Sequence, residues 1–128
     1  MARYLLILAG GAIGTLFRYI VSGLDYKVSN GIFPISTLVV NLAGSLVIGL
    51  LWGLFEHVNI HSNMRMFIFI GILGGFTTFS SFSLENFNLF RDGEVKIALT
   101  NIFLTNFFGI AMVFIGFAIS RYLINVLK

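Results

Sequence analysis

Four long apolar stretches constrain the fold of this chain more than any other feature of its sequence. They cover about residues 4–23, 33–55, 64–87 and 97–123. As a helix, each is long enough to cross a bilayer, which takes about 20 apolar residues. The short links between them carry both aspartates and both histidines. The sequence therefore predicts an all-α integral membrane protein with four transmembrane helices, forming one domain over residues 1–128.

The composition excludes several other kinds of protein. Hydrophobic residues make up 58% of the chain and charged residues 10%, whereas a soluble domain carries about 25% charged residues. The net charge of +3 is dispersed, which does not indicate a nucleic-acid surface. The chain has no cysteine, and no carboxylate pattern completes a metal site around His57 and His61. No nucleophile–base pair appears, so we do not expect an enzyme.

The distribution of basic residues contains almost no signal for orientation in the membrane. Four spans place both termini on one side, and basic residues normally accumulate on the cytoplasmic side. Four lie on each side: Arg3, Arg65, Arg121 and Lys128 with the termini, and Arg18, Lys27, Arg91 and Lys96 opposite. We predict insertion in both orientations and an antiparallel, dual-topology homodimer. The alternative is a single orientation set by other features.

Glycines recur at the small-xxx-small spacing that lets helices approach closely in lipid. The pairs are Gly10/Gly14, Gly49/Gly53 and Gly71/Gly75. Each pair suits packing within the chain and contact with a second copy about equally, so both interpretations stay open for each pair. Together with the short chain, the glycines favour an oligomer whose function lies at the shared interface.

The third span contains the most unusual segment, with two adjacent glycines followed by a run of hydroxyl side chains. Both features weaken a helix interior, so we predict a break near Gly74–Ser80. Non-helical backbone at membrane depth requires cover by protein or by a water-filled cavity. Broken spans also expose carbonyl groups that can bind ions.

Neutral polar side chains line up within the other spans. Thr37, Asn41 and Ser45 share one face of the second span, and Asn101 and Thr105 share a face of the fourth. Polar groups at this depth are expensive unless they face protein, water or a ligand. No Asp or Glu lies in the middle of any span. A cation pore would need carboxylates or carbonyl rings, so this chemistry favours a small anion.

Two aromatic and two charged residues extend this pattern. Phe79 and Phe82 lie three residues apart beside the hydroxyl run, and the edges of their rings carry partial positive charge that can meet an anion. Arg18 lies within the first span, where a guanidinium either extends to the interface or pairs. Glu85, at the far end of the third span, is a possible partner or a residue of a vestibule.

On these residues the chain resembles the Fluc (CrcB) family of fluoride channels. Three motifs support the resemblance over nearly the whole chain: Gly10–Gly14 with Arg18, Thr37–Ser45, and Gly74–Ser83 with Glu85. The resemblance implies a passive fluoride-selective channel in the plasma (inner) membrane of microbes that relieves fluoride toxicity. It also implies an antiparallel homodimer with two pores.

The resemblance further implies roles for individual residues. Phe79 and Phe82 match the phenylalanine pair that lines the pore, and Asn41 matches the pore asparagine. The remaining roles are a polar track of Thr37, Ser81 and Thr105, a structural Na⁺ held at the dimer centre by backbone carbonyls of Gly74 and Thr77, and a vestibule with Arg18 and Glu85. Gly109 stands where family members can carry a second hydroxyl on the fourth helix, and Asn101 extends the track the other way.

Two other functions fit a short four-span protein less well. A small multidrug transporter needs a membrane carboxylate to exchange protons for cationic drugs, and the first span has none. A non-transporting assembly subunit explains the glycines but not the hydroxyl-rich break. Ion flux through the purified protein would indicate a transport function, whereas co-purification with other proteins and no flux would indicate an assembly subunit.

Overall fold

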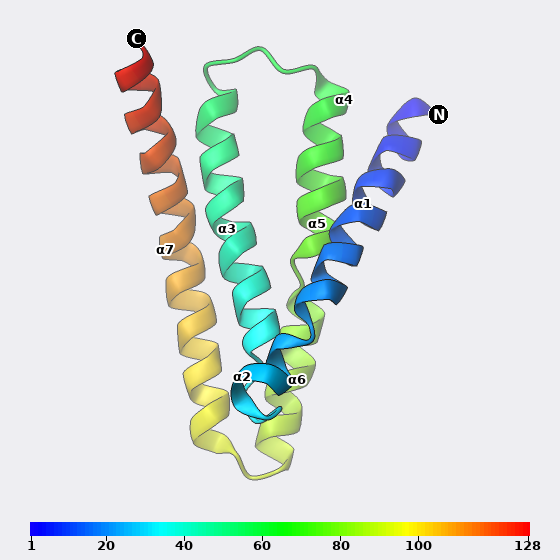
Figure 1. Cartoon of the computed structure of the whole chain (residues 1–128), viewed down its shortest axis with the longest axis vertical. Coiled ribbons are helices and arrows are strands. Elements are labelled where there is room, and N and C mark those ends of the chain that lie inside the picture. The colour runs from blue at the N-terminus through cyan, green and yellow to red at the C-terminus, as the bar shows by residue number, and fades with distance from the viewer.

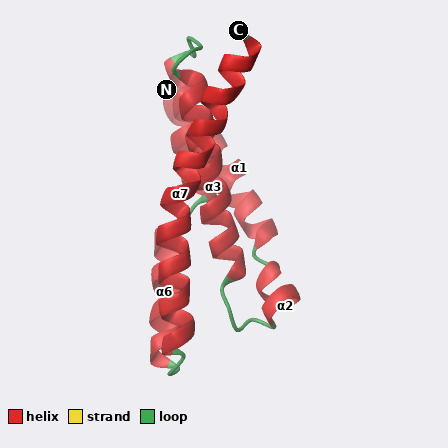
Figure 2. Cartoon of the chain, turned by 90° about the vertical axis from the view of Figure 1, so that its left-hand side faces the viewer, coloured by secondary structure: helices red, strands yellow, loops and turns green.

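The computed structural model describes all residues 1–128, and every element is a helix (Figures 1 and 2). The first, second and fourth spans contain α1 (Ala2–Val21), α3 (Ile35–Phe55) and α7 (Val95–Leu127). The third consists of α4 (Ser62–Arg65), the π-helix η1 (Met66–Leu73), α5 (Gly74–Phe76) and α6 (Phe79–Arg91). Four stretches are long and apolar enough to cross a membrane, and both termini lie at the same end (Figure 1). The predicted all-α class with four spans is confirmed.

A short helix occupies the link between the first two spans, where the sequence analysis expected only a connection. This helix, α2 (Leu24–Ser29), ends at Asn30, which has a left-handed conformation. The carboxylate of Asp25 accepts hydrogen bonds from the Ser36 backbone N–H at 2.7 Å and from the Ser36 hydroxyl at 2.8 Å. Pro34, at the N-cap position of α3, has no side-chain cap bond. Asp25 therefore satisfies the α3 terminus and ties α2 to it.

The third span breaks within the predicted segment, but at the threonines rather than at the glycines. Gly74 has helical dihedral angles and α5 continues to Phe76. Thr77 and Thr78 are extended, with ψ of 156° and 126°. β-Branched side chains favour extended backbone over helix, which explains why the helix stops at these residues. Gly75 instead packs against α1, where a Cβ atom would lie 2.7 Å from the Gly11 carbonyl oxygen.

Glycines bring the helices into backbone contact within the chain. A Cβ atom at Gly10 would lie 2.6 Å from the Phe67 carbonyl oxygen and 2.9 Å from the Gly71 Cα, so α1 and η1 meet too closely for any side chain. A Cβ at Gly49 would overlap the Val113 carbonyl of α7. These small-residue positions therefore serve intrachain packing, which was one of the two open interpretations. The result is two tightly packed pairs, α1 with η1–α5 and α3 with α7.

Candidate functional site

Two cavities flank the break in the third span. The α7 cavity, of about 500 Å³, lies between α3, the broken span and α7, and its lining includes Asn41, Ser45, Phe79, Phe82 and Thr105. The α1 cavity, of about 340 Å³, lies on the α1–α2 side, and its lining includes Arg18, Asp25, Thr37, Ser81 and Glu85. Thr78 lines both cavities. The structure thus brings most of the predicted site residues to two cavities that lie on either side of the break and share Thr78 in their linings.

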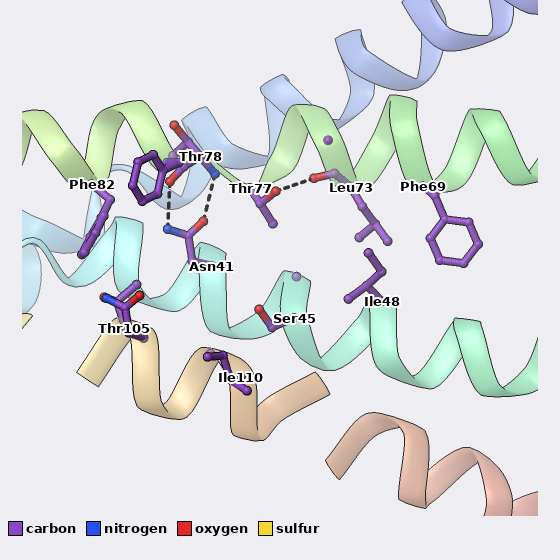
Figure 3. Close-up of a pocket in the computed structure, with 15 residues that line it drawn as sticks. Asn41, Ser45, Ile48, Phe69, Leu73, Thr77, Thr78, Phe82, Thr105 and Ile110 are labelled. Atoms are coloured by element: carbon purple, nitrogen blue, oxygen red, sulfur yellow. Dashed lines mark hydrogen bonds between the residues drawn. The ribbon is translucent and has the colours of Figure 1, made fainter. Parts of the chain in front are cut away.

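Asn41 clamps the broken backbone at Thr78. Its amide Nδ2 donates to the Thr78 carbonyl at 2.9 Å, and its Oδ1 accepts from the Thr78 backbone N–H at 2.9 Å (Figure 3). The two residues are 37 positions apart, so α3 supplies the hydrogen bonds that the third span loses. This pairing satisfies both backbone groups of Thr78 at membrane depth, where each unsatisfied group is costly.

At the break, two backbone N–H groups donate to side chains instead of to the carbonyls one helical turn earlier. In a continuous helix the Gly74 carbonyl would accept from the Thr78 N–H, and the Thr77 carbonyl from the Ser81 N–H. The Thr78 N–H donates to Asn41 instead, and the Ser81 N–H donates to the Thr78 hydroxyl at 3.2 Å. The carbonyls of Gly74 and Thr77 are therefore left free of these helical partners. These are the two carbonyls predicted for a sodium site.

The two phenylalanines of the predicted pair differ in their surroundings. Phe82 is 7% exposed, while Phe79 is 77% exposed. Their ring centroids are 5.7 Å apart, and both line the α7 cavity. The chain alone fixes the position of Phe82, whereas Phe79 lies at the open side of the cavity.

Glu85 and Thr37 form a polar contact in the lining of the α1 cavity. The Thr37 hydroxyl donates to Glu85 Oε1, and Glu85 Oε2 is buried without a partner in the chain. Arg18 lines the same cavity but makes no ion pair with Glu85. Arg18 and Glu85 thus share the lining of one cavity without an ion pair between them, and the vestibule role stays a prediction.

The two predicted polar residues of the fourth span lie in different environments. Thr105 lines the α7 cavity across from Phe82 and Asn41 (Figure 3). Asn101 is 1% exposed and lines neither cavity, because it is buried between α6 and α7. Gly109 lies in the α7 cavity wall, near Ser45, and leaves space there.

Sequence reasoning missed three residues that organise the site: Thr78, Asp25 and Asn86. Thr78 lines both cavities and caps α6 through its hydroxyl. Threonine at a helix start is a known signal for this capping role. Asp25 caps α3 across a loop, and Asn86 bonds Asn101 from another helix. No short-range pattern identifies the last two.

Comparisons with known proteins find relatives of one family over nearly the whole chain. A family model described as "CrcB-like protein, Camphor Resistance (CrcB)" matches residues 5–117. The chain is 41% identical over 128 residues, covering 100% of both chains, to the fluoride-specific ion channel FluC of Parabacteroides distasonis. It is 46% identical over 112 residues to the protein of that name from Desulfotalea psychrophila, covering 88% of this chain and 87% of the relative. With a relative of the same name from Thermus thermophilus the identity is 42% over 125 residues, covering 98% and 100%.

Proposed function

Because this chain belongs to the CrcB family, in which its relatives are named fluoride-specific ion channels, we propose that it is a passive fluoride channel. It is a multi-pass protein of the cell membrane and not an enzyme. In acidic surroundings fluoride enters the cell as the neutral weak acid and dissociates inside. An open path for the anion lets the trapped fluoride leave and relieves its toxicity.

The pair of cavities that share Thr78 is the observation that best supports this function. Hydroxyl, amide and aromatic groups line the α7 cavity without a carboxylate, and the carboxylates of Asp25 and Glu85 lie in the α1 cavity. Fluoride is small and strongly hydrated, so closely spaced neutral donors must replace its water. The Ser81 hydroxyl, the second amide hydrogen of Asn41 and the edges of Phe79 and Phe82 provide such groups without a strong trap. The Thr37 hydroxyl lines the same path but donates its hydrogen to Glu85.

Reconstitution into liposomes tests the function directly. We expect F⁻ efflux well above that of empty vesicles and little efflux of Cl⁻, because donors spaced for fluoride do not fit the larger anion. The F⁻ released into the outside medium is measured with an ion-selective electrode after a potassium ionophore removes the opposing potential. Efflux no faster than from empty vesicles would show that the chain is not a channel.

The open side of the α7 cavity supports an antiparallel homodimer with two pores. Phe79 and the amide of Asn106 are exposed there, and polar groups at membrane depth need cover by protein or water. A second copy of this chain supplies that cover. The equal distribution of basic residues between the two sides leaves both orientations open to each copy.

A tag on the C terminus tests the two orientations. We expect a membrane-impermeant reagent to label about half of the tags in intact cells and all of them after the membrane is opened, because both orientations insert equally. A tagged protein with a strong positive-inside bias serves as the control. Labelling entirely on one side contradicts dual insertion.

A structural Na⁺ fits the break chemically. The carbonyl oxygens of Gly74 and Thr77 have lost their helical N–H partners to side chains, and hard cations prefer oxygen ligands. Such an ion, bound by the carbonyls of two copies, supplies positive charge that offsets the exposed backbone dipoles. It ties the broken spans together and takes no part in moving fluoride.

Removal of sodium is therefore expected to weaken the dimer. In detergent, the purified protein should dissociate at a higher concentration when Na⁺ is replaced by N-methylglucamine at the same ionic strength, because the carbonyls then face one another without a cation. The measurement is the dimer fraction by light scattering on a size-exclusion column. A dimer fraction that is the same in both media contradicts the sodium site.

A further inference from the structure

Two buried asparagines link the fourth helix to the third span behind the α7 cavity. Asn86 is 6% exposed and Asn101 is 1% exposed. The Thr105 hydroxyl donates to Asn101 Oδ1 at 3.3 Å, Asn101 Nδ2 donates to Asn86 Oδ1 at 3.1 Å, and Asn86 Nδ2 donates to the Phe82 carbonyl at 2.8 Å. We call Asn86 and Asn101 the amide relay, because these two side chains connect Phe82 and Thr105 of the cavity lining.

The Phe82 carbonyl determines the direction of every bond in this relay. A backbone carbonyl only accepts, so Asn86 must turn its NH₂ group toward Phe82 and its oxygen toward Asn101. Asn101 must then present its NH₂ to Asn86 and its oxygen to Thr105. Reversing either amide would set two oxygens against each other in a site that excludes water. The hydroxyl of Thr105 is thus left as the donor.

A hydroxyl group has one hydrogen, and the relay directs that hydrogen away from the cavity. Thr105 lines the α7 cavity and lies across from Phe82 (Figure 3). With its hydrogen on Asn101, the side of the hydroxyl that faces the cavity carries lone pairs, which repel an anion. Fluoride can take this donor only by competing with Asn101.

We propose that the amide relay is a positioning device that weakens fluoride binding at Thr105, and that neither asparagine contacts the ion. Asn101 therefore acts through Thr105 rather than as part of the pathway. The inference rests on the proposed fluoride channel and specifies how one of its sites is regulated. Conduction needs each site to release the ion as readily as it accepts it, and the 3.3 Å bond is long enough to yield when fluoride arrives.

The test removes the relay with and without Thr105. Asn86→Leu/Asn101→Leu replaces both amides with apolar side chains of similar shape, which leaves no relay group unpaired. It frees the Thr105 hydroxyl to point into the cavity. The same pair of substitutions is then made in a Thr105→Val background. The measured quantity is the F⁻ concentration that gives half-maximal current in planar bilayers.

We expect relay removal to lower this concentration about fivefold when Thr105 is present, since fluoride no longer competes with one weak neutral hydrogen bond. In the Thr105→Val background, relay removal should not change the half-maximal F⁻ concentration: the triple variant and Thr105→Val alone should give the same value. An equal shift in both backgrounds overturns the proposal, because the asparagines would then act on fluoride or on the fold directly. No shift in either background also overturns it.

Two further measurements keep these outcomes separate from other failures. If the leucine pair does not fold, as judged by a monodisperse size-exclusion profile, Asn86→Ser/Asn101→Ser replaces it. Serine hydroxyls in a helix bond their own helix carbonyls, so this pair also disconnects Thr105. Unmodified protein that conducts no fluoride refutes the proposed function itself, before any relay variant is made.

Discussion

Substituting Asn41 with leucine is expected to destabilise the protein and to abolish fluoride efflux. The change removes the two hydrogen bonds that Asn41 makes to the Thr78 backbone, each at 2.9 Å. Each buried backbone group left unpaired costs about 1–3 kcal/mol, so the loss is about 2–6 kcal/mol in total. The break itself would have to move for other groups to restore these bonds.

Two measurements check this expectation. Thermal unfolding in detergent should show a clearly lower midpoint for Asn41→Leu, and liposomes should show F⁻ efflux close to that of empty vesicles. Loss of efflux follows because Thr78 lines both cavities, so a shift of Thr78 changes the shape of both.

Asn88→Leu provides a matched control for Asn41→Leu. Asn88 lines neither cavity and its amide bonds no backbone group of another helix, so the substitution leaves no buried backbone group unpaired. The same chemical change should therefore shift the unfolding midpoint much less. Equal destabilisation by the two substitutions would show that Asn41 is not a clamp.

Phe79→Ile and Phe82→Ile are each expected to lower fluoride efflux about tenfold or more, because isoleucine lacks the electropositive ring edge that can meet an anion. Both rings line the α7 cavity, with centroids 5.7 Å apart. Isoleucine keeps the apolar volume roughly similar, so the fold should survive. The measurement is F⁻ efflux from liposomes at equal protein density.

The environments of the two rings predict different effects on the chain itself. Phe82 is 7% exposed, so Phe82→Ile removes buried contacts and should cost about 1–2 kcal/mol of unfolding free energy. Phe79 is 77% exposed in the single chain, so Phe79→Ile should affect stability mainly through contact with the second copy of the proposed homodimer. Comparing unfolding with dimer dissociation separates these effects.

Phe114→Ile serves as the control for this pair. Phe114 is 72% exposed, close to Phe79, but it lines neither cavity. Its substitution should leave efflux within about twofold of the unmodified protein, as for an exposed side chain away from special features. If both Phe79→Ile and Phe82→Ile conduct as well as Phe114→Ile, the phenylalanines do not line the path of the ion.

The glycines show why the position of the break was only partly predictable. Adjacent glycines are poor helix formers, so the sequence placed the start of the break at Gly74. In the structure Gly75 and its neighbours stay helical because α1 lies against them; a Cβ at Gly75 would come within 2.7 Å of the Gly11 carbonyl oxygen. Their role depends on a helix more than 60 residues earlier in the chain, which local propensity does not reveal.

Asn101 shows a similar limit for the candidate site. Its spacing from Thr105 correctly puts both on one face of α7. Residues on one helix face need not line the same cavity, and only Thr105 lines the α7 cavity. Whether Asn101 meets the cavity or the interior depends on how α6 packs, and Asn86 of α6 covers it. The sequence identified a polar residue at membrane depth that needs a partner, and it could not identify that partner.

By itself, the sequence determined the four spans, the shared side of the termini and the segment in which the third span breaks. These properties follow from hydropathy and backbone propensity, which act over one helix or less. Only the tertiary structure decided that Asn41 replaces the lost hydrogen bonds at Thr78, that the predicted residues divide between two cavities, and that Asn101 lies outside both. At membrane depth every backbone group needs a partner, and at a break that partner comes from a different helix.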